Sequence, residues 1–185
     1  MLLDFDSAIR NLNFTKKDVT NITHIYSAVK DSFDSIAGEV LKSFCNDPRV
    51  QTIMRKGNVS EEKARKVWIK GLNYIFNIKI DQNFLNGIKE IGRIHVVNEV
   101  EEDLVIEAMT LFIIKIIQIV VNMENTTVEE VTSLIKGFNL VLVLMISSYR
   151  DEMNDRQNAV LKFMGISNEL LKRQIEIGKK SLKED

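Results

Sequence analysis

The sequence of 185 residues contains only one proline, one cysteine and eight glycines. Strands and their tight turns use proline and glycine, so a chain with few of either is predicted to be all-α. The lone Cys45 leaves no internal disulfide, and with no secretion signal at the N-terminus we expect a reducing, cytoplasmic setting. We interpret Cys45 as a small buried hydrophobe, since no His–Asp arrangement accompanies it.

The sequence also lacks an excess of charge of either sign. The formal net charge is −1 and acidic and basic residues are interleaved, so we expect no nucleic-acid partner. Residues 104–121 are very apolar but include Glu107, Lys115 and Gln118. A charge in the middle of a membrane span costs about 2.5–3.5 kcal/mol, and the apolar run at 140–146 is shorter than the roughly 20 residues that a span needs. We therefore predict helices buried inside the protein and no membrane partner.

Recognisable catalytic motifs are absent too. The sequence has no zinc-binding pattern, P-loop, Gly-x-Ser-x-Gly elbow or dinucleotide fingerprint. Its acidic pairs lie where helices are predicted to begin, and there they stabilise the positive end of the helix dipole. These pairs are Glu61-Glu62, Glu101-Glu102 and Glu129-Glu130. We predict that the protein is not an enzyme.

Helix-start signals divide the chain into seven or eight helices of unequal length. A leading helix is expected within residues 1–13, another from about Asp31 to Phe44, and a long one through Tyr149. We expect residues 1–152 to form one domain and residues 153–185 a helical extension, a linker or a capping helix, whose apolar stripe continues to Ile166, Leu170 and Leu171 and is interrupted by Gly165. The predicted caps and first-turn residues are Thr15 with Asp18, Pro48, Ser60, Asp81, and Thr127 with Glu130.

One of the two histidines falls on an apolar helical stripe. Counting back from His95 gives Ile91, Ile88 and Phe84, at steps of four, three and four residues. Spacing alone favours a core histidine with a hydrogen-bond partner, and a metal ligand is the alternative. The carbonyl of Ile91, one turn earlier, could accept from the second ring nitrogen.

The stretch from Phe84 to Val96, with Ile91-Gly92-x-x-His95, resembles the proximal helix of the globin-coupled sensor and protoglobin family. Three further segments agree: Tyr74-Ile75-Phe76-Asn77 is similar to the end of the distal helix, Ala108 falls in the helix after the corner, and Ser147-Ser148-Tyr149 resembles part of the last helix. The resemblance covers about residues 14–149. It implies a globin-like fold with an extra N-terminal helix and a C-terminal helical extension, and one haem b whose iron is held by His95.

The resemblance also assigns a haem pocket and shows where this chain departs from the family. The family commonly has Phe-Tyr at Val40-Leu41, where the tyrosine donates a hydrogen bond to the gas, and glycine at Glu99. It has prolines near Glu101 and Glu102 and an aromatic pair at Leu104-Val105. Spacing to His95 places Ala64 and Val67 over the iron with Trp68 beside them, and Lys89, Arg93 and Arg65 are candidates for the propionates. The implied haem contacts are His95, Ile91, Val40, Leu41, Phe44, Ala64, Val67, Trp68, Val105 and Met109.

Two functions follow from this pattern. In the first, the protein is a haem globin that binds O2, CO or NO at an apolar distal site as a gas or redox sensor. The resemblance implies a homodimer through the last two core helices, and an output domain or signalling partner is expected. In the second, it is a haem-free globin used as an interaction module in stress signalling, with a pocket that side chains or a lipid-like ligand fill.

Overall fold

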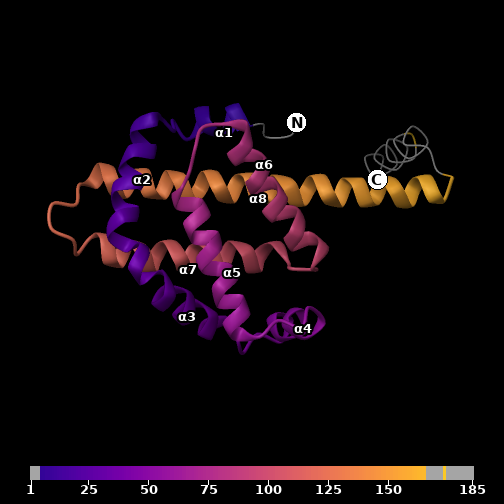
Figure 1. Ribbon diagram of the computed structural model, residues 1–185. Helices are drawn as coiled ribbons and strands as arrows, with labels where there is room; N and C mark the ends of the chain where they lie inside the picture. The colour runs from indigo at the N-terminus through magenta and orange to yellow at the C-terminus, as the bar shows by residue number, and fades with distance from the viewer. Residues whose placement is uncertain (1–4, 166–172, 174–185) are drawn as a thin grey trace, which may run out of the picture. The chain divides into compact units, whose positions relative to one another are not determined.

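The computed structural model describes residues 5–165 and residue 173. In these residues all regular structure is helical, which agrees with the predicted all-α fold (Figure 1). The predicted apolar positions Ile166, Leu170 and Leu171 lie outside the described residues. The elements in chain order are α1 (Phe5–Asn11), α2 (Lys16–Val29), the 3-10 turn η1 (Lys30–Ser32), α3 (Phe33–Phe44), α4 (Pro48–Lys56), α5 (Glu61–Phe76), α6 (Gln82–Val97), α7 (Glu102–Val120) and α8 (Val128–Phe163).

The helix starts confirm the predicted caps. Thr15 and Asp18 cap α2 reciprocally, and Thr127 and Glu130 do the same at α8. The side chains of Asp47, Ser60 and Asp81 accept from the first backbone amides of α4, α5 and α6, and Pro48 occupies the first turn of α4. The prediction for α3 was early by two residues, because no side chain caps this helix and η1 leads into it.

The core is formed by side chains from α2, α3, α5, α6, α7 and α8. Helix α3 packs against both α5 and α7. Beside this contact, the rings of Tyr26, Phe33 and Phe76 lie 5.2–6.0 Å apart, and Phe138 of α8 meets Phe76 edge-on at 5.9 Å. Each fully buried phenylalanine or leucine contributes about 1.5–3 kcal/mol, so this apolar core fixes the positions of α3 and α5.

A polar seam joins α2 to α8. Asp18 is 5 % exposed, and its carboxylate accepts from Thr15, from the hydroxyl of Ser133 at 2.8 Å and from Lys136 at 3.3 Å. Nearby, a Cβ at Gly137 would lie 2.6 Å from Cδ1 of Ile22, so the two helices approach closely there. Burial raises the pKa of Asp18, but the hydrogen bonds outweigh it and hold the pKa below its ordinary value. One carboxylate therefore both caps α2 and fastens it to α8.

The chain has two compact units, residues 1–149 and residues 150–185. Helix α8 is continuous past Tyr149 and ends at Phe163 before Gly165, whose φ is +71°. The expected domain boundary after residue 152 stays a prediction. Helix α8 is long and apolar enough to span a membrane, but core helices of soluble proteins share this property, and 56 % of its most apolar window is buried.

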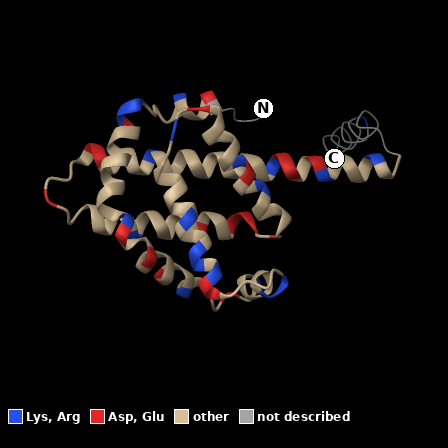
Figure 2. Ribbon diagram, in the orientation of Figure 1, with Lys and Arg blue, Asp and Glu red and all other residues tan. Residues whose placement is uncertain are grey.

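Charged residues of both signs are distributed along most helices, with acidic residues gathered at the start of α7 (Figure 2). This acidic corner pairs with α4. Arg49 donates to Glu101 at 2.8 Å and to Asp103 at 2.6 Å, and Lys56 pairs with Glu99. The resemblance leads one to expect glycine and prolines at this corner, between Glu99 and Glu102. In this chain, ion pairs with α4 hold the corner instead.

Candidate functional site

His95 lies in the last turn of α6, and its imidazole has one nitrogen engaged. Nδ1 lies 2.7 Å from the carbonyl oxygen of Ile91, as the sequence predicted, and donates to it. The structure gives Nε2 no partner among the described residues. No side-chain nitrogen or oxygen in the described part of the chain is both fully buried and without a partner, so Nε2 is not completely enclosed. Burial lowers the pKa of His95, which the Ile91 hydrogen bond only partly offsets, so the ring is neutral with a free lone pair.

The backbone after His95 ends α6 in a Schellman motif. The amide of Val100 donates to the carbonyl of His95 at 2.9 Å, and the amide of Glu99 donates to Val96 at 3.0 Å. This geometry needs a left-handed residue after the C-cap, and Glu99 occupies it with φ of +56°. The glycine that the family resemblance places here is the residue that the conformation favours, so Glu99 carries a backbone cost.

Helix α5 supplies an aromatic side chain to the interior. Trp68 meets Phe44 of α3 edge-on at 6.2 Å and Phe112 of α7 edge-on at 5.3 Å. The indole N–H has no partner among the described residues, and Trp68 is half-buried, so this donor is available. Phe112 was missed in the sequence, although it follows Met109 by three residues on the buried stripe of α7. The cluster has an apolar surface with one available donor.

The same face of α5 has open space beside a glycine. Ala64, Trp68 and Gly71 follow one another at steps of four and three residues, so they share a stripe. Gly71 is half-buried, yet a Cβ added there would meet nothing within 4 Å. The space at Gly71 leaves room for a flat group against α5, and His95 is a neutral imidazole of the kind that serves as an axial ligand of a macrocycle.

Helices α5 and α6 are joined at their ends next to the connecting loop. Tyr74 stacks on Phe84 with ring centroids 5.4 Å apart, and a Cβ at Gly87 would overlap the Tyr74 hydroxyl. His95 is eleven residues beyond Phe84, or about 16 Å further along α6. The contact therefore holds the two helices at one end and leaves the histidine turn away from that joint.

The predicted pocket residues differ in burial. Five of them are buried, three side chains besides His95 are half-buried, and Val67 is 59 % exposed. The structure brings Phe44 and Trp68 into contact, and the place of Val67 over a bound cofactor stays a prediction. The buried residues are Val40, Leu41, Phe44, Val105 and Met109, and the half-buried ones are Ala64, Trp68 and Ile91.

The second histidine and two of the three predicted propionate partners have partners elsewhere. His24 lies on α2, and its Nδ1 is 2.6 Å from Glu130 of α8. Of the predicted propionate partners, Arg65 pairs with Asp34 and Arg93 with Glu90, both at 2.7 Å. Those two arginines are thus surface ion-pair members in the structure, and Lys89 is half-buried.

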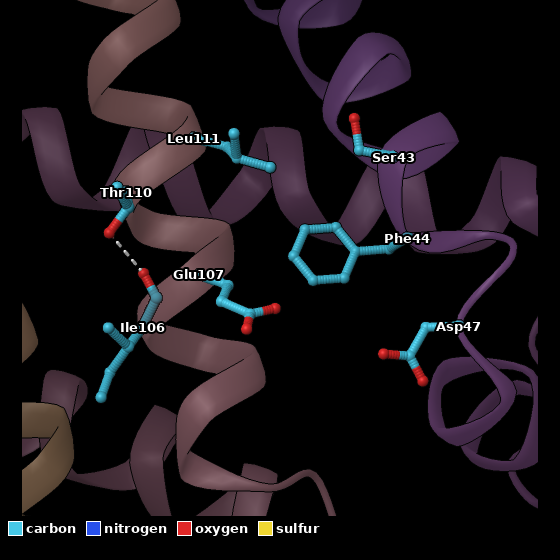
Figure 3. A pocket seen from close by; sticks show the side chains of 7 residues that line it. All are labelled: Ser43, Phe44, Asp47, Ile106, Glu107, Thr110 and Leu111. Atoms are coloured by element: carbon cyan, nitrogen blue, oxygen red, sulfur yellow. Dashed lines mark hydrogen bonds between the residues drawn. The ribbon is translucent and has the colours of Figure 1, made fainter.

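A pocket of about 370 Å³ opens between the end of α3 and α7 (Figure 3). Phe44 points across it from α3, with the carboxylates of Asp47 and Glu107 at its sides. Since Phe44 also contacts Trp68, this ring belongs both to the lining of the pocket and to the aromatic cluster. The lining residues are Ser43, Phe44, Asp47, Ile106, Glu107, Thr110 and Leu111.

The comparison with protein families agrees with this architecture. A family model described as Protoglobin matches residues 3–155, which is most of the chain. No curated protein matches the sequence. The matched residues include helices α1 to α7 and the part of α8 up to residue 155. The chain therefore belongs to the Protoglobin family.

Proposed function

We propose that this protein binds one haem b through His95 and uses it to bind a diatomic gas as a gas or redox sensor. The observation that carries the proposal is the state of the imidazole, with Nδ1 held by Ile91 and Nε2 without a partner among the described residues. When bound, haem supplies an iron with a coordination position for O2, CO or NO. Everything else in the function is the work of side chains that hold the cofactor and surround the gas.

Each part of the site has a separate role in this proposal. The Ile91 carbonyl fixes the tautomer and the orientation of the His95 ring, and the low pKa keeps the ring neutral and able to ligate. The open space beside Gly71 gives a macrocycle room against α5. Phe44, Trp68 and Phe112 give the interior side of α5 an apolar aromatic surface.

The distal surface sets the preference among gases. Val40 and Leu41 are buried aliphatic side chains where the family commonly has a tyrosine, so the indole N–H of Trp68 is the donor in the aromatic cluster. Bound O2 is polar, and one donor is worth about 1–3 kcal/mol to it, whereas CO and NO depend on a donor much less. We expect fast O2 release relative to CO, measured by stopped-flow and flash photolysis. Slow O2 release from the wild-type protein would refute this preference, and a large further acceleration in Trp68→Phe would identify the indole as the donor.

Hemin titration tests the central proposal. The expected result is one hemin per chain with a Soret band that His95→Ala abolishes. The chain offers a matched control in its other histidine, because His24→Ala removes an exposed imidazole on α2 and should leave binding unchanged. Failure of wild-type protein to bind hemin stoichiometrically would overturn the proposal and favour the haem-free interaction module.

We propose further that the protein is a homodimer through α7 and α8. Apolar side chains remain exposed on both helices: Ile106 and Ile114 are 39 % and 44 % exposed on α7, and Ile135 is 39 % exposed on α8. An exposed apolar surface of this kind is typical of an interaction site. Light scattering after size exclusion should give twice the chain mass, and Ile114→Lys should give monomer. A monomeric wild-type protein would refute the dimer.

A further inference from the structure

Helix α6 meets α8 at a glycine three residues before His95. A Cβ at Gly92 would overlap Oγ of Ser148 and lie 2.8 Å from the carbonyl oxygen of Met145. The Ser148 hydroxyl donates to that same carbonyl at 2.6 Å, so it cannot readily turn away. The two backbones therefore touch here, and only glycine permits their separation.

The second contact lies five residues after His95. The hydroxyl of Tyr149 donates to the carbonyl of Val100 at 3.1 Å, and the amide of Val100 donates in turn to the carbonyl of His95 at 2.9 Å. Tyr149 is 6 % exposed, and burial, with the nearby charge of Glu102, raises its pKa, so the phenol keeps its proton and remains a donor. Two hydrogen bonds thus run from α8 to the backbone of the histidine.

We infer that Gly92 and Tyr149 are positioning residues for the His95 imidazole. Consecutive residues of α8, Ser148 and Tyr149, hold the chain on both sides of His95, at Gly92 and at Val100. The ring is fixed to its own helix by Ile91, so a helix that shifts or rotates on α8 carries Nε2 with it. The inference rests on the proposed function, since it concerns how firmly an iron ligand is held.

The test compares two tyrosine variants of the full chain. Tyr149→Phe removes one hydroxyl and keeps the buried ring. Tyr26→Phe is the control, because it removes a comparable hydrogen bond, to Asn73 at 2.7 Å, in contact with α5. With hemin bound, Tyr149→Phe should shift the iron–histidine stretching band in resonance Raman spectra and weaken hemin affinity roughly twofold to tenfold, and Tyr26→Phe should do neither.

The haem-free protein provides a second readout. Imidazole 15N shifts of His95 should move in Tyr149→Phe and stay in place in Tyr26→Phe. Gly92→Ala should move them further, with Gly38→Ala as its control, because a Cβ at Gly38 meets only the Arg65 side chain at 3.8 Å. If Gly92→Ala does not fold, the tyrosine pair decides alone.

The two proposals fail in different ways. A wild-type protein that binds no hemin refutes the proposed function, and the 15N shifts then decide the positioning role. A wild-type protein that binds hemin, with the Raman band, affinity and imidazole shifts of Tyr149→Phe equal to those of Tyr26→Phe, refutes the positioning role alone.

Discussion

Glu99 occupies a left-handed backbone conformation at the end of α6, with φ of +56°. We expect the variant Glu99→Gly to be more stable than Glu99→Ala. A non-glycine residue in this conformation costs about 1–2 kcal/mol of strain, which glycine avoids. Glycine in turn destabilises the folded state by about 0.5–1 kcal/mol, because its unfolded chain has greater conformational entropy. The difference left is about 0.5–1 kcal/mol in favour of glycine. Both variants lose the carboxylate that pairs with Lys56, so the comparison isolates the backbone.

Thermal and urea unfolding of the two variants measure this difference. For a chain of this size, it corresponds to a melting temperature roughly 1–4 °C higher for Glu99→Gly. Glu90 is a matched control on the same helix, because it is exposed, helical and also paired with a cation, Arg93. There the order should reverse, with Glu90→Gly less stable than Glu90→Ala by about 1 kcal/mol. Equal stability of the two Glu99 variants, or a more stable Glu99→Ala, would refute the reasoning.

Three further predictions concern the site and the α2–α8 seam. Gly71→Leu should fill the space beside α5 and lower the hemin stoichiometry. The free energy of unfolding of the haem-free variant should stay equal or rise, because leucine is the better helix former. Full hemin binding by this variant would contradict the proposal that the space beside Gly71 holds the cofactor. Asp18→Asn should lower the free energy of unfolding by about 2 kcal/mol, because it removes a buried charged acceptor from Thr15 and Ser133; a urea-melt loss under about 0.5 kcal/mol would be inconsistent with this. The pKa of His95 is lowered in the folded protein, so as pH falls the unfolded chain binds a proton first, from about pH 6.5. The free energy of unfolding is therefore highest above that pH and decreases as pH falls toward the folded pKa, and urea melts at pH 7.5 and 5.5 should show this decrease. An equal decrease in His95→Gln would exclude His95 as its source.

The features that could be predicted from the sequence are those with short-range causes. A cap joins residues three apart, so Thr15 with Asp18 and Thr127 with Glu130 could be located by pattern alone. The hydrogen bond from His95 to Ile91 spans one helical turn, so it could be predicted once the stripe was recognised. The family assignment rested on the order and spacing of such local segments, and the family match confirmed it.

The features that could not be predicted depend on contacts between distant segments. Nothing near Gly92 in sequence announces that Ser148 and Met145 of α8 lie against it. Phe112 joins Trp68 only because α7 and α5 both pack on α3, so its place in the aromatic cluster follows from tertiary packing. The acidic corner at Glu101 could be seen as helix capping, but its pairing with Arg49 required the position of α4.

Different interactions hold the two sides of the candidate site, so the two sides differ in the substitutions that they tolerate. The histidine side is fixed by directional hydrogen bonds, from His95 to Ile91 and from Tyr149 through Val100, and a backbone contact at Gly92. The distal side is held by apolar contact, which is non-directional, and volume-conserving swaps in such a cluster usually cost less than about 1.5 kcal/mol. Under the proposed function, substitutions of Phe44 or Trp68 therefore change the surface that meets a gas while leaving the imidazole in place. Gas preference and cofactor retention are then separable properties of the proposed site, and gas preference is the easier to alter.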